Sequence, residues 1–447
     1  MVLPDSPEML SQFENILDFD PLIDEVGFIH PTQFVALSEE VGSPAHSSVV
    51  PELHPEDGIL EPKASNIISS GTVFWCRDHK LGISTEIILP LYKAVKLRFM
   101  DALERYKTQN NISTKKDESG GMSMSCCFSS SLDILEGEVM KHSKALLLLS
   151  CDFGTAWNAR KLVLSNKGQL QKLTDELFLA SLVLSYAPKS ECAWSHRRWV
   201  IKMIAGKCPN LQEIVQKESE LVEKLAEKSK MNYRAWNHRC WLVSYTSREQ
   251  VMHELKKSKD WSGLHIADNS CFHYRTRLML RILEDISDKQ SPTTSCSCSA
   301  ELCHMWKEEL DWNKSLITRY VGREALWLHR RFLSVGWIKH FVIDIRDGFC
   351  HSNDRGTMSQ EIGNFIDDEL LLCRSCSTIE DNDFEDFQAH GIYSATYLLW
   401  LIKQIAEFLP IELRSKFVVG ELKTFMEEVC PEKIFLLYSF QGTCQSA

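Results

Sequence analysis

The sequence lacks several features that mark specialised classes of protein. Basic residues are not in excess, since 50 Lys and Arg stand against 61 Asp and Glu in 447 residues, a formal charge of −11. Nucleic-acid-binding proteins usually carry a basic surface, so this balance argues against a nucleic-acid partner. Purely apolar runs, such as Ala145–Leu149, are far too short to cross a bilayer. We therefore expect no transmembrane segment.

The start of the chain lacks the basic residues and the apolar stretch of a secretory signal. This absence leads us to expect a cytoplasmic protein. The sequence contains 16 cysteines, but they follow no regular spacing. In a reducing compartment such cysteines are free thiols, so we expect no disulfide framework.

What the sequence does contain is a repeated motif, an aromatic residue followed three positions later by arginine. Its clearest copy lies in Met231–Trp241, MNYRAWNHRCW. The five copies are Trp157 with Arg160, Trp194 with Arg197, Trp236 with Arg239, Phe272 with Arg275, and Trp327 with Arg330. Successive aromatic positions are 37, 42, 36 and 55 residues apart. Such spacing is typical of one helical hairpin per copy.

The spacing within the motif explains why both residue types are needed. Positions three apart lie on one face of a helix, so the ring can pack against the next hairpin while the guanidinium reaches beside it. Arginine can then donate to carboxylates or helix-end carbonyls of a neighbouring repeat. Good N-cap residues precede the motif, namely Asp152, Ser190, Asn232 and Asp268 or Asn269. The pattern predicts an all-α fold, a right-handed superhelix or solenoid of helical hairpins.

The predicted repeats occupy residues 132–345, and the rest of the chain divides around them. Residues 1–72 show no sustained period and are expected to form a partly ordered segment packed on the repeats. Residues 73–131 should contain one helix and a mobile loop. Residues 287–300 form a Ser- and Cys-rich insert that accounts for the longest step, and 346–447 should form a polar linker and a helical cap.

Three polar stretches set these predicted boundaries. Gln109–Ser131 has too few apolar residues to pack and is expected to be a loop after a helix over about 85–107. Ser287–Ala300 and Arg346–Gln360 are predicted to be irregular for the same reason. Beyond them, the amphipathic pattern predicts further helices and a degenerate sixth hairpin; these helices lie near Ile362–Cys373, Tyr393–Phe408 and Ser415–Val429.

The motif, introduced by Asn232-Tyr233, resembles the repeat of the protein prenyltransferase alpha-subunit family. Two further segments match this repeat, PKSECAWSHRRW at 188–199 and DNSCFHYR at 268–275. The resemblance implies a crescent of paired helices around a separate beta subunit, an α/α barrel with the zinc ion and the isoprenoid pocket. It implies a protein geranylgeranyltransferase that is inactive without its partner, a beta subunit of the Rab geranylgeranyltransferase type. No cofactor is implied for this chain.

The implied reaction joins an isoprenoid diphosphate, here geranylgeranyl diphosphate, to a C-terminal cysteine of acceptor proteins. Lys189 stands where the family's lysine reaches the diphosphate, and Tyr233 stands where the family places a tyrosine facing the beta subunit. Asn232 and Arg234 flank that tyrosine and are implied to bind substrate. The chain departs from the family pattern where Glu191 replaces a tyrosine, Arg234 replaces a histidine and Met231 replaces a lysine.

Plainer interpretations stand beside these. The aromatic and arginine positions are expected to build the fold and to do no chemistry. The histidines at the second position after the ring, His196, His238 and His329, are expected to lie on the surface or between repeats rather than to bind metal. A zinc site is one alternative for a group of scattered residues, Cys296, Cys298, Cys303, His304, Cys373 and Cys376, and reduced thiols are the other. A non-catalytic helical-repeat adaptor is the rival function.

Overall fold

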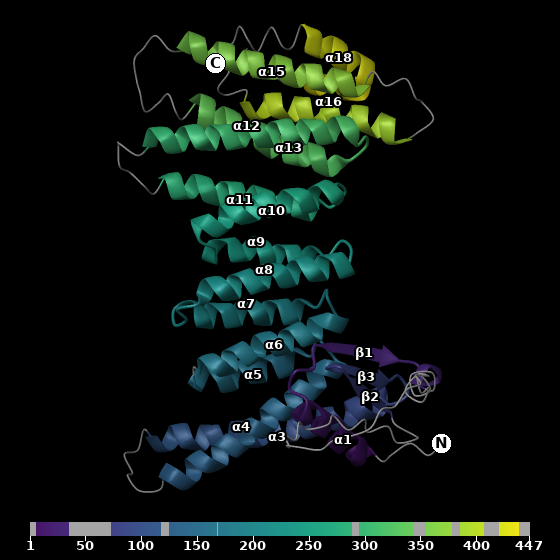
Figure 1. Ribbon diagram of the computed structural model, residues 1–447, viewed down its shortest axis with the longest axis vertical. Coiled ribbons are helices and arrows are strands. Elements are labelled where there is room, and N and C mark those ends of the chain that lie inside the picture. The colour runs from purple at the N-terminus through teal and green to yellow at the C-terminus, as the bar shows by residue number, and fades with distance from the viewer. Residues whose placement is uncertain are drawn as a thin grey trace, which may run out of the picture. The chain divides into compact units, whose positions relative to one another are not determined.

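The computed structural model describes residues 6–34, 73–117, 125–167, 169–287, 295–343, 355–377, 385–405 and 420–437. The chain divides into two compact units, Met1–His238 and Arg239–Ala447. Both consist mainly of antiparallel helices that pack in sequence order (Figure 1). The predicted all-α helical-repeat class is confirmed, with one small sheet added to it.

The first unit is built from helices that pack on their neighbours in the sequence. Its helices are α1 (Ser6–Phe19), α3 (Ile88–Asp117), α4 (Ser125–Leu149), α5 (Gly154–Lys167), α6 (Leu170–Tyr186), α7 (Glu191–Ala205), α8 (Leu211–Lys228) and the first turns of α9 (Tyr233–Leu242). On α6, a buried stripe with helical spacing contains Leu173, Leu177, Ala180 and Leu184. Such a stripe forms because burial of one apolar face stabilises a helix more than its intrinsic propensity does.

A three-stranded sheet near the N-terminus is the feature that the sequence pattern did not reveal. Its strands are β1 (Glu25–Ile29), β2 (Phe74–Arg77) and β3 (Lys80–Ser84), in the order β1-β3-β2. β1 pairs with β3 in parallel, and β2 pairs with β3 as an antiparallel hairpin. The sheet packs on α6, where the Val26 amide donates to Ser185 Oγ at 3.1 Å. The strands are too short for their alternation to stand out in the sequence.

The second unit repeats the hairpin pattern. Its helices are α10 (Arg248–Leu264), α11 (Asn269–Ser287), α12 (Ser295–Arg319), α13 (Glu324–Trp337), α15 (Arg355–Ser377), α16 (Glu385–Ile405) and α18 (Glu421–Val429), with the short helices η1 (Val243–Tyr245), η2 (Ile338–Ile343) and η3 (Pro431–Lys433). α10 packs on α11, α12 on α13, and α15 on α16. The last pair is the sixth hairpin that the amphipathic pattern predicts.

Three predicted irregular stretches are wrong at their edges. α3 continues to Asp117 and α4 begins at Ser125, so both ends of the predicted loop 109–131 are helical. Similarly, α12 begins at Ser295 and α15 at Arg355. A low apolar content excludes burial but not helix, because each residue added to an existing helix gains a hydrogen bond. The middles of these three stretches lie outside the described residues.

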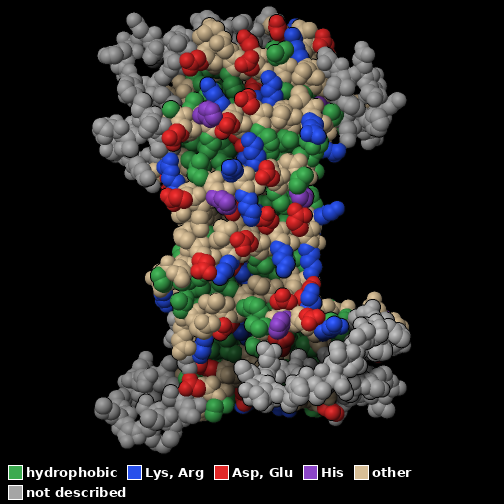
Figure 2. Space-filling view, viewed as in Figure 1, with side chains coloured by type: hydrophobic (Ala, Val, Ile, Leu, Met, Phe, Trp, Pro, Cys, Tyr) green, Lys and Arg blue, Asp and Glu red, His purple; other side chains and the backbone are tan. Residues whose placement is uncertain are grey.

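Charges are interspersed on the face that Figure 2 shows. Lys and Arg side chains alternate there with Asp and Glu, and neither sign forms a broad patch. Within the described parts of the chain, no helix is long and apolar enough to cross a membrane.

Candidate functional site

Each motif arginine bridges its own hairpin to the next one. Arg160 of α5 donates from Nε and Nη2 to the two carboxylate oxygens of Glu176 on α6, at 2.8 and 2.5 Å. Its Nη1 donates backwards to the Met140 carbonyl at 2.7 Å and to Ser143 Oγ at 2.8 Å, both on α4. One buried guanidinium therefore holds three helices together.

The same bridge recurs at the other copies. The carboxylate partners are Glu218 for Arg197, Glu254 for Arg239, Glu309 for Arg275 and Glu369 for Arg330. The backbone partners are the carbonyls of Leu177 for Arg197 at 2.5 Å, Leu255 for Arg275 at 2.6 Å, and Leu310 for Arg330 at 2.6 Å. The five motif rings are at most 2% exposed. The carboxylate contacts are those that the motif's spacing predicts, but the accepting carbonyls lie within a helix of the arginine's own hairpin and not at helix ends of a neighbouring repeat.

Each of these carboxylates also accepts a hydrogen bond from a ring on its own hairpin. At three copies the donor is histidine, with Nε2–Oε distances of 2.8 to 3.1 Å; the pairs are His196 with Glu176, His238 with Glu218, and His329 with Glu309. At the other two the donor is a tyrosine hydroxyl at 2.7 Å; the pairs are Tyr274 with Glu254, and Tyr397 with Glu369. The histidines are thus internal partners of carboxylates, and they lie between repeats because each ring also packs on the motif ring of the preceding copy.

The electrostatics of these clusters suit a structural role. Burial acts to raise the pKa of the Glu176 carboxyl, but the Arg160 charge and the hydrogen bond from His196 outweigh it and hold this pKa at about 2. Burial also lowers the pKa of His196, so the ring is neutral at pH 7 and donates from Nε2. The Arg160 cluster therefore holds one positive and one negative charge, which neutralise each other inside the protein.

A fixed sequence offset connects the carboxylates to the motif, and it was missed from the sequence. Four of the five glutamates stand 18 residues before the motif ring of their own hairpin; the pairs are Glu176 with Trp194, Glu218 with Trp236, Glu254 with Phe272, and Glu309 with Trp327. Aligning the copies over both helices of the hairpin, instead of over the motif helix alone, would have found them.

The turns that precede α7 and α9 are joined by side-chain hydrogen bonds. Ser190 caps α7 by accepting from the Ala193 amide at 3.2 Å, and its hydroxyl donates to Asp152 at 2.7 Å. Asn232 caps α9 in the same way, since its Oδ1 accepts from the Ala235 amide at 3.2 Å. The Asn232 Nδ2 group donates to the Pro188 carbonyl at 2.9 Å. Asn232 thus positions the turn that carries Lys189, and both ends of its own amide are used.

Lys189 and Tyr233 both project from this edge into solvent. Lys189 is exposed, and it forms no ion pair with any residue that the structure describes. Tyr233 is the first residue of α9 and is 68% exposed. Both side chains are therefore free to meet a ligand or a partner, on turns that are firmly held beneath them.

Two of the three departures from the family pattern contact each other. Arg234 of α9 forms an ion pair with Glu191, the first residue of α7, through its Nη1 and the carboxylate Oε2. The other oxygen of Glu191 accepts from Arg198 Nη2 at 2.8 Å. Arg234 was predicted to bind substrate, and here it is held by a carboxylate two residues after Lys189. Glu191 adds a negative charge where the family has a tyrosine, and Arg234 adds a positive charge where the family has a histidine, so the two added charges neutralise each other.

The protein prenyltransferase alpha subunit repeat model matches residues 173–204, 215–246 and 306–335. These segments cover most of α6 and α7, most of α8 with all of α9, and the C-terminal part of α12 with most of α13. The chain belongs to the protein prenyltransferase alpha-subunit repeat family. The copies around Trp157 and Phe272 lie outside the matched segments, yet they form the same bridges, so the prenyltransferase repeat extends over five hairpins.

The relatives of this chain fall into two groups, which differ in name and in their sequence identity to it. The chain is 31% identical over 237 residues to the human protein prenyltransferase alpha subunit repeat-containing protein 1, covering 44% of this chain and 58% of that protein. It is 32% identical over 294 residues to the Danio rerio protein of the same name, and this match covers 56% of this chain and 66% of that protein. The geranylgeranyl transferase type-2 subunit alpha of Saccharomyces cerevisiae is 26% identical over 154 residues, and this match covers 33% of this chain and 46% of that protein. The chain thus spans about half to two thirds of these relatives.

The zinc-site alternative requires the scattered cysteines and His304 to lie together, and the described part of the structure shows no such cluster. Cys373 and Cys376 are buried, and the Cys303 and His304 positions lie on α12, where His304 faces Glu308 at 3.6 Å. In the described portion of the chain, no three His, Cys, Asp or Glu side chains are grouped as metal ligands. The side chains of Cys296 and Cys298 lie outside that portion.

Proposed function

We propose that this chain is the alpha subunit of a heterodimeric protein prenyltransferase in the cytoplasm. The observation that carries the proposal is the pair of exposed side chains, Lys189 and Tyr233, on turns fixed by Ser190 and Asn232 in two family-matched repeats. Exposed polar groups on a rigid support are what a shared active site requires.

The reaction would be attack by an acceptor protein's C-terminal cysteine thiolate on carbon 1 of an isoprenoid diphosphate. Negative charge grows on the leaving diphosphate as its bond to carbon breaks. The Lys189 ammonium would neutralise part of that charge, and the Tyr233 hydroxyl would donate a hydrogen bond to it. Zinc, which the proposal assigns to the beta subunit, keeps a bound thiol deprotonated.

The donor and the partner follow from the resemblance and from the relatives' names. The yeast relative, 26% identical, is a geranylgeranyl transferase type-2 alpha subunit. The proposal therefore takes geranylgeranyl diphosphate as the donor and a beta subunit of the Rab geranylgeranyltransferase type as the partner. The acceptors are proteins that end in or near a cysteine.

A second candidate is a non-catalytic adaptor that kept the helical repeats. The Glu191–Arg234 ion pair favours it, because it places a negative charge close to the proposed diphosphate position and occupies Arg234. An adaptor would bind its targets without a barrel-shaped beta subunit, and Lys189 would be dispensable to it.

The test is co-expression with the Rab-type beta subunit, followed by gel filtration with light scattering and a transfer assay with labelled geranylgeranyl diphosphate. A one-to-one complex with transfer activity is expected. Lys189→Ala should lower the rate about 10² to 10³-fold, as for other fixed charge-stabilising groups. Lys172→Ala, at an exposed position of α6, is the matched control. Lack of a complex, or full activity of the Lys189→Ala heterodimer, would favour the adaptor.

A further inference from the structure

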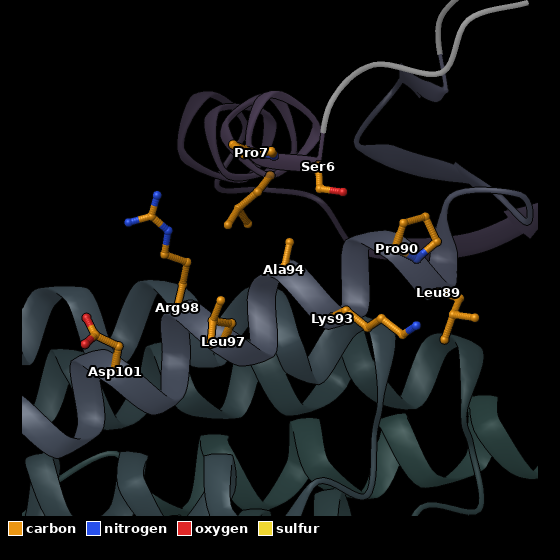
Figure 3. Close-up of a pocket in the computed structure, with 10 residues that line it drawn as sticks. Ser6, Pro7, Leu89, Pro90, Lys93, Ala94, Leu97, Arg98 and Asp101 are labelled. Carbon is orange, nitrogen blue, oxygen red and sulfur yellow. The ribbon is translucent and has the colours of Figure 1, made fainter.

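A groove between α1 and α3 lies outside the family-matched repeats. Its volume is about 760 Å³. Ser6, Pro7 and Leu10 line it from α1, and seven residues from Leu89 to Asp101 line it from α3 (Figure 3). Neither the repeat packing nor the proposed reaction uses this groove.

The α3 wall is unusually apolar for an exposed helix face. Leu89 is 60% exposed and Leu97 is 73% exposed, with Pro90 and Ala94 between them on the same wall. Exposed leucines scattered singly are ordinary, but two that border one groove form a surface that gains free energy when it is covered.

The rim of the groove carries two cations without a matching carboxylate. Lys93 and Arg98 form no ion pair with the residues that the structure describes, and Figure 3 shows their side chains extending away from each other along α3. Asp101 also lines the groove, but its carboxylate accepts from Arg105 at 3.0 Å. Some other basic residues of this unit are paired, such as Lys141 with Asp18 and Lys80 with Glu25, whereas the two rim cations border the groove without such a partner. The groove is therefore complementary to an acidic partner.

The shape of the groove determines the partner's secondary structure. Both walls are helices, whose backbone groups are already hydrogen-bonded, so the groove offers an extended peptide no backbone partner of the kind that a sheet edge provides. A helix satisfies its own backbone and needs only side-chain contacts. Leu89 to Asp101 spans about 18 Å, or three turns, and Lys93 and Arg98 are separated by about 7.5 Å of helical rise. Because the two side chains extend away from each other along α3, the carboxylates that pair with them would lie more than one turn apart on a partner helix.

We propose that the α1/α3 groove binds an acidic amphipathic helix of a partner protein. Leucine-type side chains of that helix pack on Leu89, Ala94 and Leu97, and its flanking carboxylates pair with Lys93 and Arg98. The site is independent of the proposed prenyl transfer, and binding there requires no beta subunit.

The test measures fluorescence anisotropy of the full chain with a labelled 16-residue synthetic helix that carries leucines on one face and glutamates beside them. A second probe has lysines in place of the glutamates. The glutamate probe should bind at least tenfold more tightly at 50 mM NaCl. The double substitution Lys93→Glu with Arg98→Glu should remove that preference, and Leu97→Ser should weaken binding about tenfold. In 0.5 M NaCl the effect of the charges should shrink.

Two matched controls keep the result specific. Leu264→Ser changes an 81% exposed leucine on α10, and Lys172→Glu reverses an exposed charge on α6, so neither should alter binding. Circular dichroism verifies that each variant is folded. Equal binding of both probes, or binding that survives the groove substitutions, would overturn the proposal. So would self-association or binding to phosphatidylserine vesicles that Leu97→Ser abolishes, because the occupant would then be a second copy or a membrane.

Discussion

Arg197 and Glu218 stand 21 residues apart in the sequence, and the guanidinium donates to both carboxylate oxygens where each side chain is only 3% exposed. His238 donates to the same carboxylate from the next motif helix at 2.9 Å. A single carboxylate thus joins two hairpins. The repeat is defined by this three-residue cluster as much as by the aromatic ring that makes it visible in the sequence.

Glu218→Gln should destabilise the protein strongly. The amide keeps the shape of the carboxyl group but leaves the Arg197 charge buried and unneutralised, a loss of about 3 to 5 kcal/mol in the free energy of unfolding. Urea denaturation followed by circular dichroism measures it. Glu213→Gln is the control, because Glu213 pairs with Lys217 on the exposed surface of the same helix, where such pairs contribute little. Equal midpoints for the two variants would refute the role given to the cluster.

His390 should make the stability of the second unit depend on pH. Its Nδ1 accepts from the Gly322 amide at 3.2 Å and from Trp327 Nε1 at 3.3 Å, so the ring must be neutral. Burial lowers its pKa to about 4 from the ordinary 6.5. The unfolded chain takes up a proton near pH 6.5 and the folded chain only near pH 4, so stability is complete above 6.5 and falls as the pH drops towards 4.

The measurement is the urea midpoint between pH 7.5 and pH 4.5, in the native chain and in His390→Asn. Asparagine offers an oxygen acceptor and does not titrate, so its curve should be flatter over this range. The carboxylates with a pKa of about 2, such as Glu309, lose their contribution only below about pH 4.5 and leave this window largely unaffected. Parallel curves for the two proteins would show that His390 is not the titrating group.

Asn232→Asp should distinguish the two roles of this side chain, which caps α9 and also holds the turn that carries Lys189. Aspartate still accepts from the Ala235 amide and so still caps α9, but it cannot donate to the Pro188 carbonyl. The expected loss of stability is about 1 kcal/mol, the order of one hydrogen bond. If the turn positions Lys189 for transfer, kcat of the heterodimer should fall severalfold while KM for the donor changes little. Asn232→Ala, which loses both bonds, should be the more destabilised variant, and the reverse order would contradict the assignment.

Glu191→Gln should strengthen the binding of the diphosphate donor without altering the fold. Glu191 and Arg234 are about half exposed, so their ion pair contributes less than about 1 kcal/mol to stability. Removing the carboxylate frees Arg234 and Arg198 and takes a negative charge away from the vicinity of Lys189. The Kd of the heterodimer for geranylgeranyl diphosphate should fall about three- to tenfold. Glu213→Gln again serves as the control, and an unchanged Kd for Glu191→Gln would place the diphosphate beyond the reach of this charge.

Some features of the fold could be predicted from the sequence because they recur at regular spacing. The five ring-and-arginine pairs recur at hairpin spacing, and that recurrence predicts the helical repeats and the buried faces. The boundaries of the polar stretches were not accessible, since helix extension beyond a packed core depends on the neighbouring helix and leaves no mark in composition. The N-terminal sheet escaped for a related reason: β1 pairs with β3, more than fifty residues away, and such pairing has no local signature.

By itself, the sequence determined the class of the fold and the identity of the repeating unit, because the spacing of rings and arginines in a helix follows from 3.6 residues per turn. The resemblance to the prenyltransferase repeat, and not the spacing itself, singled out Lys189 and Tyr233. Only the tertiary structure decided which carboxylate each arginine meets, that the histidines donate to those carboxylates, and that Glu191 and Arg234 compensate each other. Those partners are distant in the chain, and they are brought together only when one hairpin packs on the next.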